Sequence, residues 1–415
     1  MTESKKKEIG DDNISEKSRE IIEKVKASAN YCYNCNRCVS VCPLAQLDRF
    51  SPRKLVTDLA LLPLEEVLEK HNIWECLTCG QCSVYCPMTT DKQGVKIPEL
   101  ILELRQLSKE SEEQVERMAQ CETHDDIFPL VSRLMVENPS PPDKLGFIKE
   151  NDLKTTTKGP IAYFVGCLPL MEDIIFNFEV NYTNTAKSVI GLLNEAEIEP
   201  VVLNEKCCGH DILWGKADED TFKKLAEYNV QLYRDAGVKT VITSCAEGYR
   251  TWKIDYPKVI EDFDFEVLHI SEFLLREKIL EHIRFPSERQ IKVTYHDACR
   301  IGRFGPKLYE APREILRKIP GVELIEMKNI KDDALCCGVS AFSCCNEYTR
   351  IIRQLRLEDA AQTGAEYLIV PCPKCLTHFN CFLTEPSVSK KKQQLKEKIK
   401  VVDFSTFIGE LLYLI

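Results

Sequence analysis

Two short runs of cysteine constrain this chain more than any other feature of its sequence. Residues 32–42 and 76–86 each follow the pattern C-x2-C-x2-C-x3-C, and a proline comes directly after each run. Cysteines separated by two residues lie on one tight turn, so three thiolates of a run can reach one polynuclear metal centre. The short spacing also disfavours disulfides within a run. Each run therefore predicts a ligand loop for a cubane iron–sulfur (4Fe-4S) cluster.

The two runs resemble those of two-cluster bacterial ferredoxins, a family that transfers electrons between two cubane clusters. In such runs the fourth cysteine ligates the cluster of the other run. One predicted ligand set is therefore Cys32, Cys35, Cys38 and Cys86. The other predicted set is Cys76, Cys79, Cys82 and Cys42. A pair of zinc sites is the alternative, but zinc ribbons use paired C-x2-C units rather than a triple followed by C-P.

The number of cysteines narrows the class of protein. The chain has 415 residues and 21 cysteines, an odd number that excludes complete internal pairing. This content is too dilute for a small disulfide scaffold and too high for thiols that only fill a core. The N-terminal residues lack the apolar segment of a signal peptide, and no stretch approaches the roughly 18 to 20 apolar residues of a membrane span. We therefore expect a cytoplasmic, reduced protein that meets a membrane only through a partner.

Charge and motif content argue against several classes of ligand. Lysine and arginine number 55 against 65 aspartate and glutamate residues, which gives a formal net charge of −10. This sign disfavours binding to nucleic acids and to anionic membranes. No G-x-G-x-x-G follows a predicted strand, so a flavin or nicotinamide would reside on a partner subunit.

Periodicity divides the chain into three domains. Residues 1–137 contain the cysteine runs and apolar residues at helical spacing, which predicts an α-helical two-cluster ferredoxin-like domain. Residues 138–159 are rich in proline and charge and are interpreted as a linker. Short β-branched runs then alternate with long amphipathic segments, a pattern typical of parallel α/β sheets. The predicted strands lie in residues 161–166, 199–203, 239–244, 266–270, 292–296, 322–327, 366–371 and 398–403.

An internal repeat divides the α/β region into residues 160–286 and 287–415. Each copy has a cysteine after its first strand, a Cys-Cys-Gly triplet, and a further cysteine after a later strand. The expected fold is therefore α+β overall, with a helical domain followed by two repeated α/β (Rossmann-like, parallel-sheet) domains. Open α/β sheets build their sites at the carboxyl ends of the strands, where these cysteines fall.

The second copy carries five cysteines, of which two are adjacent. Five thiols exceed the needs of one tetrahedral metal ion, so a polynuclear iron–sulfur site is more natural than zinc. The spacing resembles the CCG domain of heterodisulfide reductase catalytic subunits, where it holds a noncubane 4Fe-4S cluster. A ferredoxin domain before two CCG domains is the organisation of the D-type subunit and of related iron–sulfur oxidoreductases. The resemblance implies that the cluster ligands and catalytic cysteines are Cys299, Cys336, Cys337, Cys372 and Cys375.

The first copy departs from this pattern because Gly248 stands where the last cysteine is expected. Its ligand candidates are Cys167, Cys207, Cys208 and Cys245. Four thiolates can hold an ordinary cubane, so we expect a 4Fe-4S cluster here. Zinc and an incomplete noncubane cluster are the alternatives. His210 is near enough in sequence to act as a ligand, although a loop histidine is more often only hydrogen-bonded.

Three further residues lie close in sequence to Cys299. His296, Arg300 and Arg303 could bind an anionic substrate such as a carboxylate or phosphate. The alternative is an ordinary hydrogen-bonded histidine with two solvated arginines. Sequence alone leaves both interpretations open.

The family resemblance implies an oxidoreductase that works in a multisubunit complex. Electrons would enter from a flavin- or iron–sulfur-containing partner, pass through the two cubanes and reach the CCG clusters. Those clusters would reduce or form a disulfide substrate, as in heterodisulfide reductase. The alternative is a non-catalytic relay subunit that links a flavoprotein dehydrogenase or other redox complex to a quinone, a ferredoxin or a partner acceptor.

Overall fold

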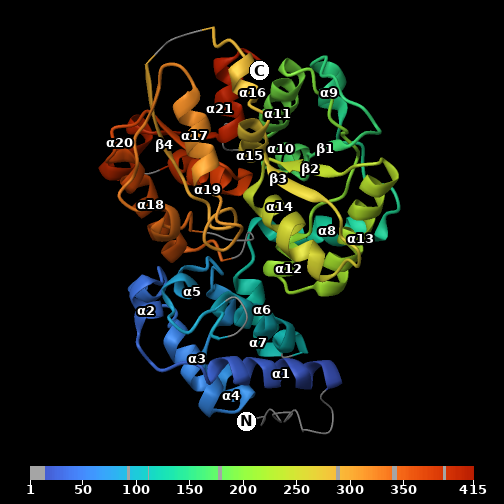
Figure 1. Cartoon of the computed structure of the whole chain (residues 1–415). Helices are drawn as coiled ribbons and strands as arrows, with labels where there is room; N and C mark the ends of the chain where they lie inside the picture. The colour runs from blue at the N-terminus through green and yellow to red at the C-terminus, as the bar shows by residue number, and fades with distance from the viewer. Residues whose placement is uncertain are drawn as a thin grey trace. The chain divides into compact units, whose positions relative to one another are not determined.

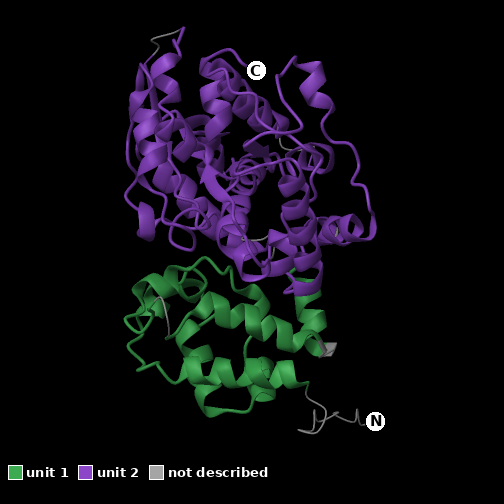
Figure 2. Cartoon of the chain, turned by 45° about the vertical axis from the view of Figure 1, so that its right-hand side comes forward, with its two compact units in different colours: residues 1–121 green, residues 122–415 purple. Residues whose placement is uncertain are grey.

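The chain divides into two compact units, Met1–Cys121 and Glu122–Ile415 (Figures 1 and 2). The structure is a computed structural model. It describes residues 15–90, 94–110, 112–175, 180–286, 290–338, 344–386 and 389–415. No helix among these residues has both the length and the apolar composition that a membrane crossing requires.

Unit 1 is helical, as predicted. Its helices are α1 (Glu16–Ala29), α2 (Arg37–Val41), α3 (Pro52–Leu61), α4 (Leu64–Lys70), α5 (Gln81–Tyr85), α6 (Ile97–Leu107) and α7 (Glu112–Gln120). Helix α3 begins where the Ser51 hydroxyl accepts a hydrogen bond from the Lys54 amide, and Pro52 occupies the first helical position. Helix α1 packs against α3 and α6, and this packing buries Leu55 and Ile101. These contacts form the apolar core that supports the cysteine loops.

Unit 2 begins with helices α8 (Ile127–Glu137) and α9 (Gly146–Glu150). The predicted helical domain extended to residue 137, whereas the structure groups α8 with the α/β region. The reason is packing, because α8 contacts α12 (His210–Trp214) and α13 (Glu219–Asp235) and buries Phe128 and Met135.

Two parallel sheets form the centre of unit 2, which confirms the predicted fold class. The first sheet has the order β1 (Ile161–Phe164), β2 (Thr240–Thr243), β3 (Glu266–His269). The second has the order β5 (Val322–Leu324), β4 (Ile291–Tyr295), β6 (Tyr367–Val370), β7 (Lys400–Asp403). The predicted strand at 199–203 is reduced to isolated bridges in which Val201 pairs with Thr156 and Ala162. Val201 thus lies beside β1 as β5 lies beside β4, so the two sheets share one arrangement.

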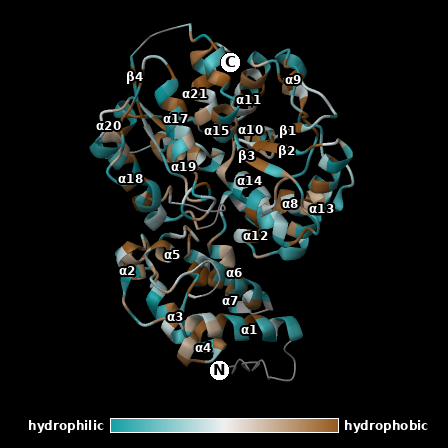
Figure 3. Cartoon of the chain, viewed as in Figure 1, coloured by the Kyte–Doolittle hydropathy of each residue, from teal (hydrophilic) through white to brown (hydrophobic). Residues whose placement is uncertain are grey.

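Helices surround both sheets. The first sheet is accompanied by α10 (Leu168–Ile174), α11 (Thr183–Glu195), α12, α13, α14 (Ala246–Arg250), α15 (Ile270–Arg276) and α16 (Ile279–His282). The second is accompanied by α17 (Glu310–Lys318), α18 (Glu347–Ala361), α19 (Pro373–Thr384), α20 (Lys390–Lys398) and α21 (Phe404–Leu411). Figure 3 shows apolar colour on β1 and β2 and hydrophilic colour on α20. This is the pattern of a sheet buried on both faces.

Replacing Gly409 by alanine is expected to lower the free energy of unfolding by about 1–3 kcal/mol, because the added methyl group would overpack a helix contact. Helix α21 packs closely on α11 at this point, and a Cβ atom at Gly409 would lie 2.7 Å from Cβ of Ser188. Gly146→Ala is the control, since its Cβ would have no neighbour nearer than 3.8 Å. Denaturant unfolding of both variants checks the prediction, and equal stability of the two would contradict it.

Candidate metal centres

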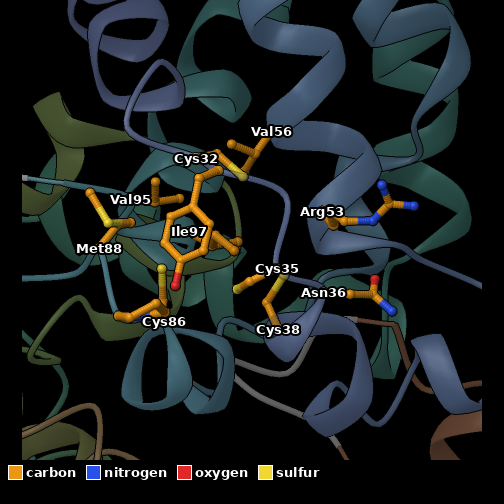
Figure 4. Close-up of a pocket in the computed structure, with 12 residues that line it drawn as sticks. Cys32, Cys35, Asn36, Cys38, Arg53, Val56, Cys86, Met88, Val95 and Ile97 are labelled. Carbon is orange, nitrogen blue, oxygen red and sulfur yellow. The ribbon is translucent and has the colours of Figure 1, made fainter.

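A cavity in unit 1 brings together the four cysteines of the first predicted set. Cys32, Cys35, Cys38 and Cys86 all line it. Figure 4 shows these side chains around the cavity together with apolar residues. The apolar part of the lining consists of Val56, Pro87, Met88, Val95 and Ile97.

A second cavity is lined by the other predicted set. Its cysteines are Cys42, Cys76, Cys79 and Cys82. Leu44, Phe50 and Leu77 contribute to its lining. Each cavity thus contains three cysteines of one run and the fourth cysteine of the other.

The exchange of the fourth cysteine has a local structural cause. Helices α2 and α5 are five-residue helices that pack against each other, and each starts after a residue in the left-handed conformation. That residue is Asn36 in the first run (φ 66°) and Gly80 in the second (φ 78°). Cys42 and Cys86 follow the far ends of these helices. Each therefore leaves its own loop and reaches the opposite cavity.

The electrostatics of the two cavities suit a cationic centre. Burial, together with neighbouring sulfurs, raises the pKa of Cys38 to about 11 and that of Cys42 to about 12. Burial also raises the pKa of Cys82 well above its ordinary value, again with a contribution from nearby thiols. Four thiolates in an apolar cavity repel each other unless positive charge lies between them. Sulfur donors and an apolar lining therefore fit thiolate-ligated iron–sulfur clusters.

The first cysteine set of unit 2 follows β1 and β2. Cys167 is the residue before α10, Cys245 is the residue before α14, and Cys207 and Cys208 precede α12. The Cys208 thiol donates a hydrogen bond to Cys207 and thereby lowers the pKa of Cys207. Gly248 lies within α14, and a Cβ atom there would meet only Cβ of Cys245, at 3.6 Å. Space alone therefore does not exclude a fifth cysteine at this position.

The second set follows β4 and β6. Cys299 comes after β4, and Cys336 and Cys337 lie between β5 and α18. Cys372 precedes α19, which carries Cys375. Its last four members are buried, whereas Cys299 is half-buried. The Cys375 thiol interacts with the sulfurs of Cys337 and Cys372, and these contacts together with burial raise its pKa.

The two cysteine sets of unit 2 meet. The Cys245 thiol donates a hydrogen bond to Cys372, which lowers the pKa of Cys372. Next to this contact the amide of Ala246 donates a hydrogen bond to the carbonyl of Pro371 at 3.0 Å. The carboxyl end of β2 therefore lies against the carboxyl end of β6, and thiols of both repeats line one junction.

A buried ion-pair cluster occupies the same junction, and sequence reasoning missed it. Lys374, which lies between Cys372 and Cys375, forms ion pairs with Asp211 and Glu247 of the first repeat. Its exposed fraction is only 4%. Burial opposes the charge of Lys374, but the two carboxylates outweigh it and raise the lysine pKa. Burial raises the pKa of Glu247 to about 7 despite the lysine. The sequence did offer one signal for this cluster, because all three charged residues lie within three positions of a cysteine of the predicted sets.

His210 is hydrogen-bonded through both ring nitrogens. Its Nδ1 lies 3.0 Å from the Thr251 hydroxyl, and its Nε2 accepts a hydrogen bond of 3.0 Å from Nε of Arg300. Burial and the positive charge of Arg300 lower the histidine pKa. This arrangement leaves neither nitrogen for a metal ion, so the structure favours the hydrogen-bonded interpretation.

The structure contradicts the solvated alternative for the arginines near Cys299. Arg300 is only 1% exposed and lies over the rings of Trp214 and Phe304. Arg303 is also buried and donates a hydrogen bond to a backbone carbonyl. His296 is buried and accepts a hydrogen bond of 3.1 Å from Arg356. These side chains therefore belong to the interior that supports the second cysteine set.

Comparisons with known families agree with this geometry. Residues 28–90 match a 4Fe-4S dicluster domain, a match that supports two cubane clusters. Residues 161–249 and 293–380 each match the cysteine-rich CCG domain. The two domain types thus appear in the order predicted from the cysteine pattern.

Proteins similar to this chain include named oxidoreductases and an iron–sulfur protein. The D-type subunit of dihydromethanophenazine:CoB–CoM heterodisulfide reductase of Methanosarcina acetivorans is 27% identical, over 92% of this chain and 93% of the relative. An uncharacterised iron–sulfur protein of Methanococcus maripaludis is 27% identical, over 92% of this chain and 72% of the relative. EtfAB:quinone oxidoreductase of Syntrophomonas wolfei is 25% identical, over 82% of this chain and 46% of the relative. The chain therefore belongs to the CCG-domain iron–sulfur oxidoreductases related to the D-type subunit of heterodisulfide reductase, in which a dicluster domain precedes two cysteine-rich domains.

Proposed function

We propose that this chain is the disulfide-reducing, or disulfide-forming, subunit of a multisubunit oxidoreductase. The eight cysteines of unit 1 would hold two cubane 4Fe-4S clusters as two interleaved sets. The five cysteines of the second repeat would hold a noncubane 4Fe-4S cluster, and the four of the first repeat a further 4Fe-4S cluster. Bound clusters supply and accept single electrons, which lets a two-electron conversion proceed in two steps.

The observation that carries this proposal is the junction where Cys245 meets Cys372. A disulfide held there would have a thiol ligand set on each side. Its reduction takes up two electrons and two protons, breaks one S–S bond and yields two thiols. The surrounding residues are buried, so they would exclude water from this conversion. One relative is a subunit of a larger reductase, which supports partner subunits as the source of electrons. We expect these partners to contain flavin or iron–sulfur clusters.

Two features favour a second function, electron relay without a substrate. The first repeat has Gly248 in place of a fifth cysteine, and the ion pairs of Lys374 lie at the junction between the sets. A relay subunit needs the clusters but no space for a disulfide. It would pass electrons between a flavoprotein and a quinone, a ferredoxin or a partner acceptor.

Metal analysis of anaerobically purified protein tests the cluster assignment. We expect about 16 iron atoms per chain, since each of four clusters contains four. About eight iron atoms with stoichiometric zinc would contradict the assignment in unit 2.

Electron paramagnetic resonance separates disulfide chemistry from relay. Thiol added to the oxidised protein is expected to change the paramagnetic signal of the second repeat, and Cys299→Ala should abolish this response. Cys381→Ala is the control, because Cys381 is a half-buried thiol outside all four predicted sets. A spectrum that thiol leaves unchanged would support the relay function instead.

A further inference from the structure

The two cysteine loops of unit 1 have identical spacing but opposite exposure. In the first loop residues 33–37 are all exposed, including Cys35. In the second loop residues 77–82 are all buried, and Cys79 and Cys82 are each 9% exposed. The cavity of Cys32, Cys35, Cys38 and Cys86 is therefore the one whose ligand loop is accessible to another molecule. The two cavities therefore differ in the exposure of their ligand loops, although the two motifs have the same spacing.

The exposed loop carries the side chains of a protein interface. Tyr31 is 40% exposed and Tyr33 is 58% exposed, and these two aromatic residues flank Cys32. Tyrosine is enriched at protein–protein interfaces and at their energetic centres. The loop also has a defined shape, because Asn34 adopts a left-handed conformation and its side-chain oxygen accepts hydrogen bonds from Arg53 and Thr57. A preformed loop loses little conformational entropy on binding.

The side chains of this loop other than the cysteine ligands carry a charge opposite to that of the chain. Arg37 is exposed, and Arg53 lines the cavity of the first cysteine set. No acidic residue occurs from residue 31 to residue 47, whereas the whole chain has a net charge of −10. Complementary charge steers association and fixes the orientation of a partner. The loop therefore suits a partner with an acidic face.

We propose that residues 31–37, together with Arg53, form the docking surface for an acidic electron-carrier protein. The inference rests on the proposed function, because it assumes that Cys32, Cys35, Cys38 and Cys86 hold a redox cluster. In each encounter the carrier is oxidised by one electron and the cluster is reduced by one electron. The aromatic side chains make the contact, and the arginines set its charge preference.

Stopped-flow reduction of the holoprotein by a reduced acidic [2Fe-2S] ferredoxin tests this surface. Arg37→Glu is expected to slow reduction about tenfold at low ionic strength, and the difference should shrink as salt screens the charges. Tyr31→Ser should slow reduction at all salt concentrations, because it removes contact area rather than charge. Arg19→Glu is the control, since Arg19 is exposed and lies about three turns from the end of α1 that leads into the loop.

Reduction by dithionite is the second measurement, because this small reductant needs no protein docking surface. Both loop variants should keep the wild-type iron content and the wild-type rate with dithionite. Failure of the ferredoxin to reduce the wild-type protein, or equal ferredoxin rates for the wild type and Arg37→Glu, would overturn the docking proposal. Failure of the thiol response in unit 2 would instead contradict disulfide chemistry and leave docking intact.

Discussion

The double variant Cys42→Ala/Cys76→Ala is expected to lose about four iron atoms, no more than either single variant loses. The reason is that both cysteines line one cavity, and an alanine at either position removes a ligand from the same cluster. Cys42→Ala/Cys32→Ala should lose about eight iron atoms, because Cys32 lines the other cavity. Iron analysis after anaerobic purification measures both losses.

The two double variants show whether the fourth cysteine of each run ligates the cluster of the other run or that of its own run. If Cys42 served the cluster of its own run, the two double variants would exchange results. Cys42→Ala/Cys32→Ala would then lose about four iron atoms and Cys42→Ala/Cys76→Ala about eight. Cys381→Ala should lose none, and it controls for general damage from losing a thiol.

Local patterns in the sequence were sufficient to predict much of the fold. The short β-branched runs that became β1, β2 and β6 are bounded by turns and alternate with helices, so each signal lies within a few residues. The segment at 199–203 has the same local signal, but only Val201 pairs with its neighbours. Whether a strand extends depends on the adjacent chain, and composition does not encode that information.

Contacts between the repeats could not be predicted in this way. Lys374 and Asp211 are 163 residues apart, and no short pattern connects them. The usual expectation that charged residues lie at the surface also fails here, because Arg300 and Lys374 are buried. Lys374 lies where the two cysteine sets meet, and a functional requirement there can outweigh the cost of burying its charge.

Replacing Lys374 by methionine is expected to lower the free energy of unfolding by about 3–5 kcal/mol. Methionine has a similar length, so the change removes charge with little change of volume. It leaves Asp211 and Glu247 buried without their counter-ion, and uncompensated buried charge is more costly than loss of the pair itself. Denaturant unfolding of the variant and the wild-type protein measures the loss.

A matched substitution at an exposed ion pair distinguishes burial from simple loss of a lysine. Lys391 pairs with Glu358 at 2.7 Å, but its side chain is 61% exposed. Lys391→Met should therefore cost only about 0–1 kcal/mol. Adding Asp211→Asn and Glu247→Gln to Lys374→Met should recover part of the stability, because neutral amides no longer require a counter-ion. Equal losses for Lys374→Met and Lys391→Met would show that Lys374 does not neutralise buried charge at the junction of the two cysteine sets.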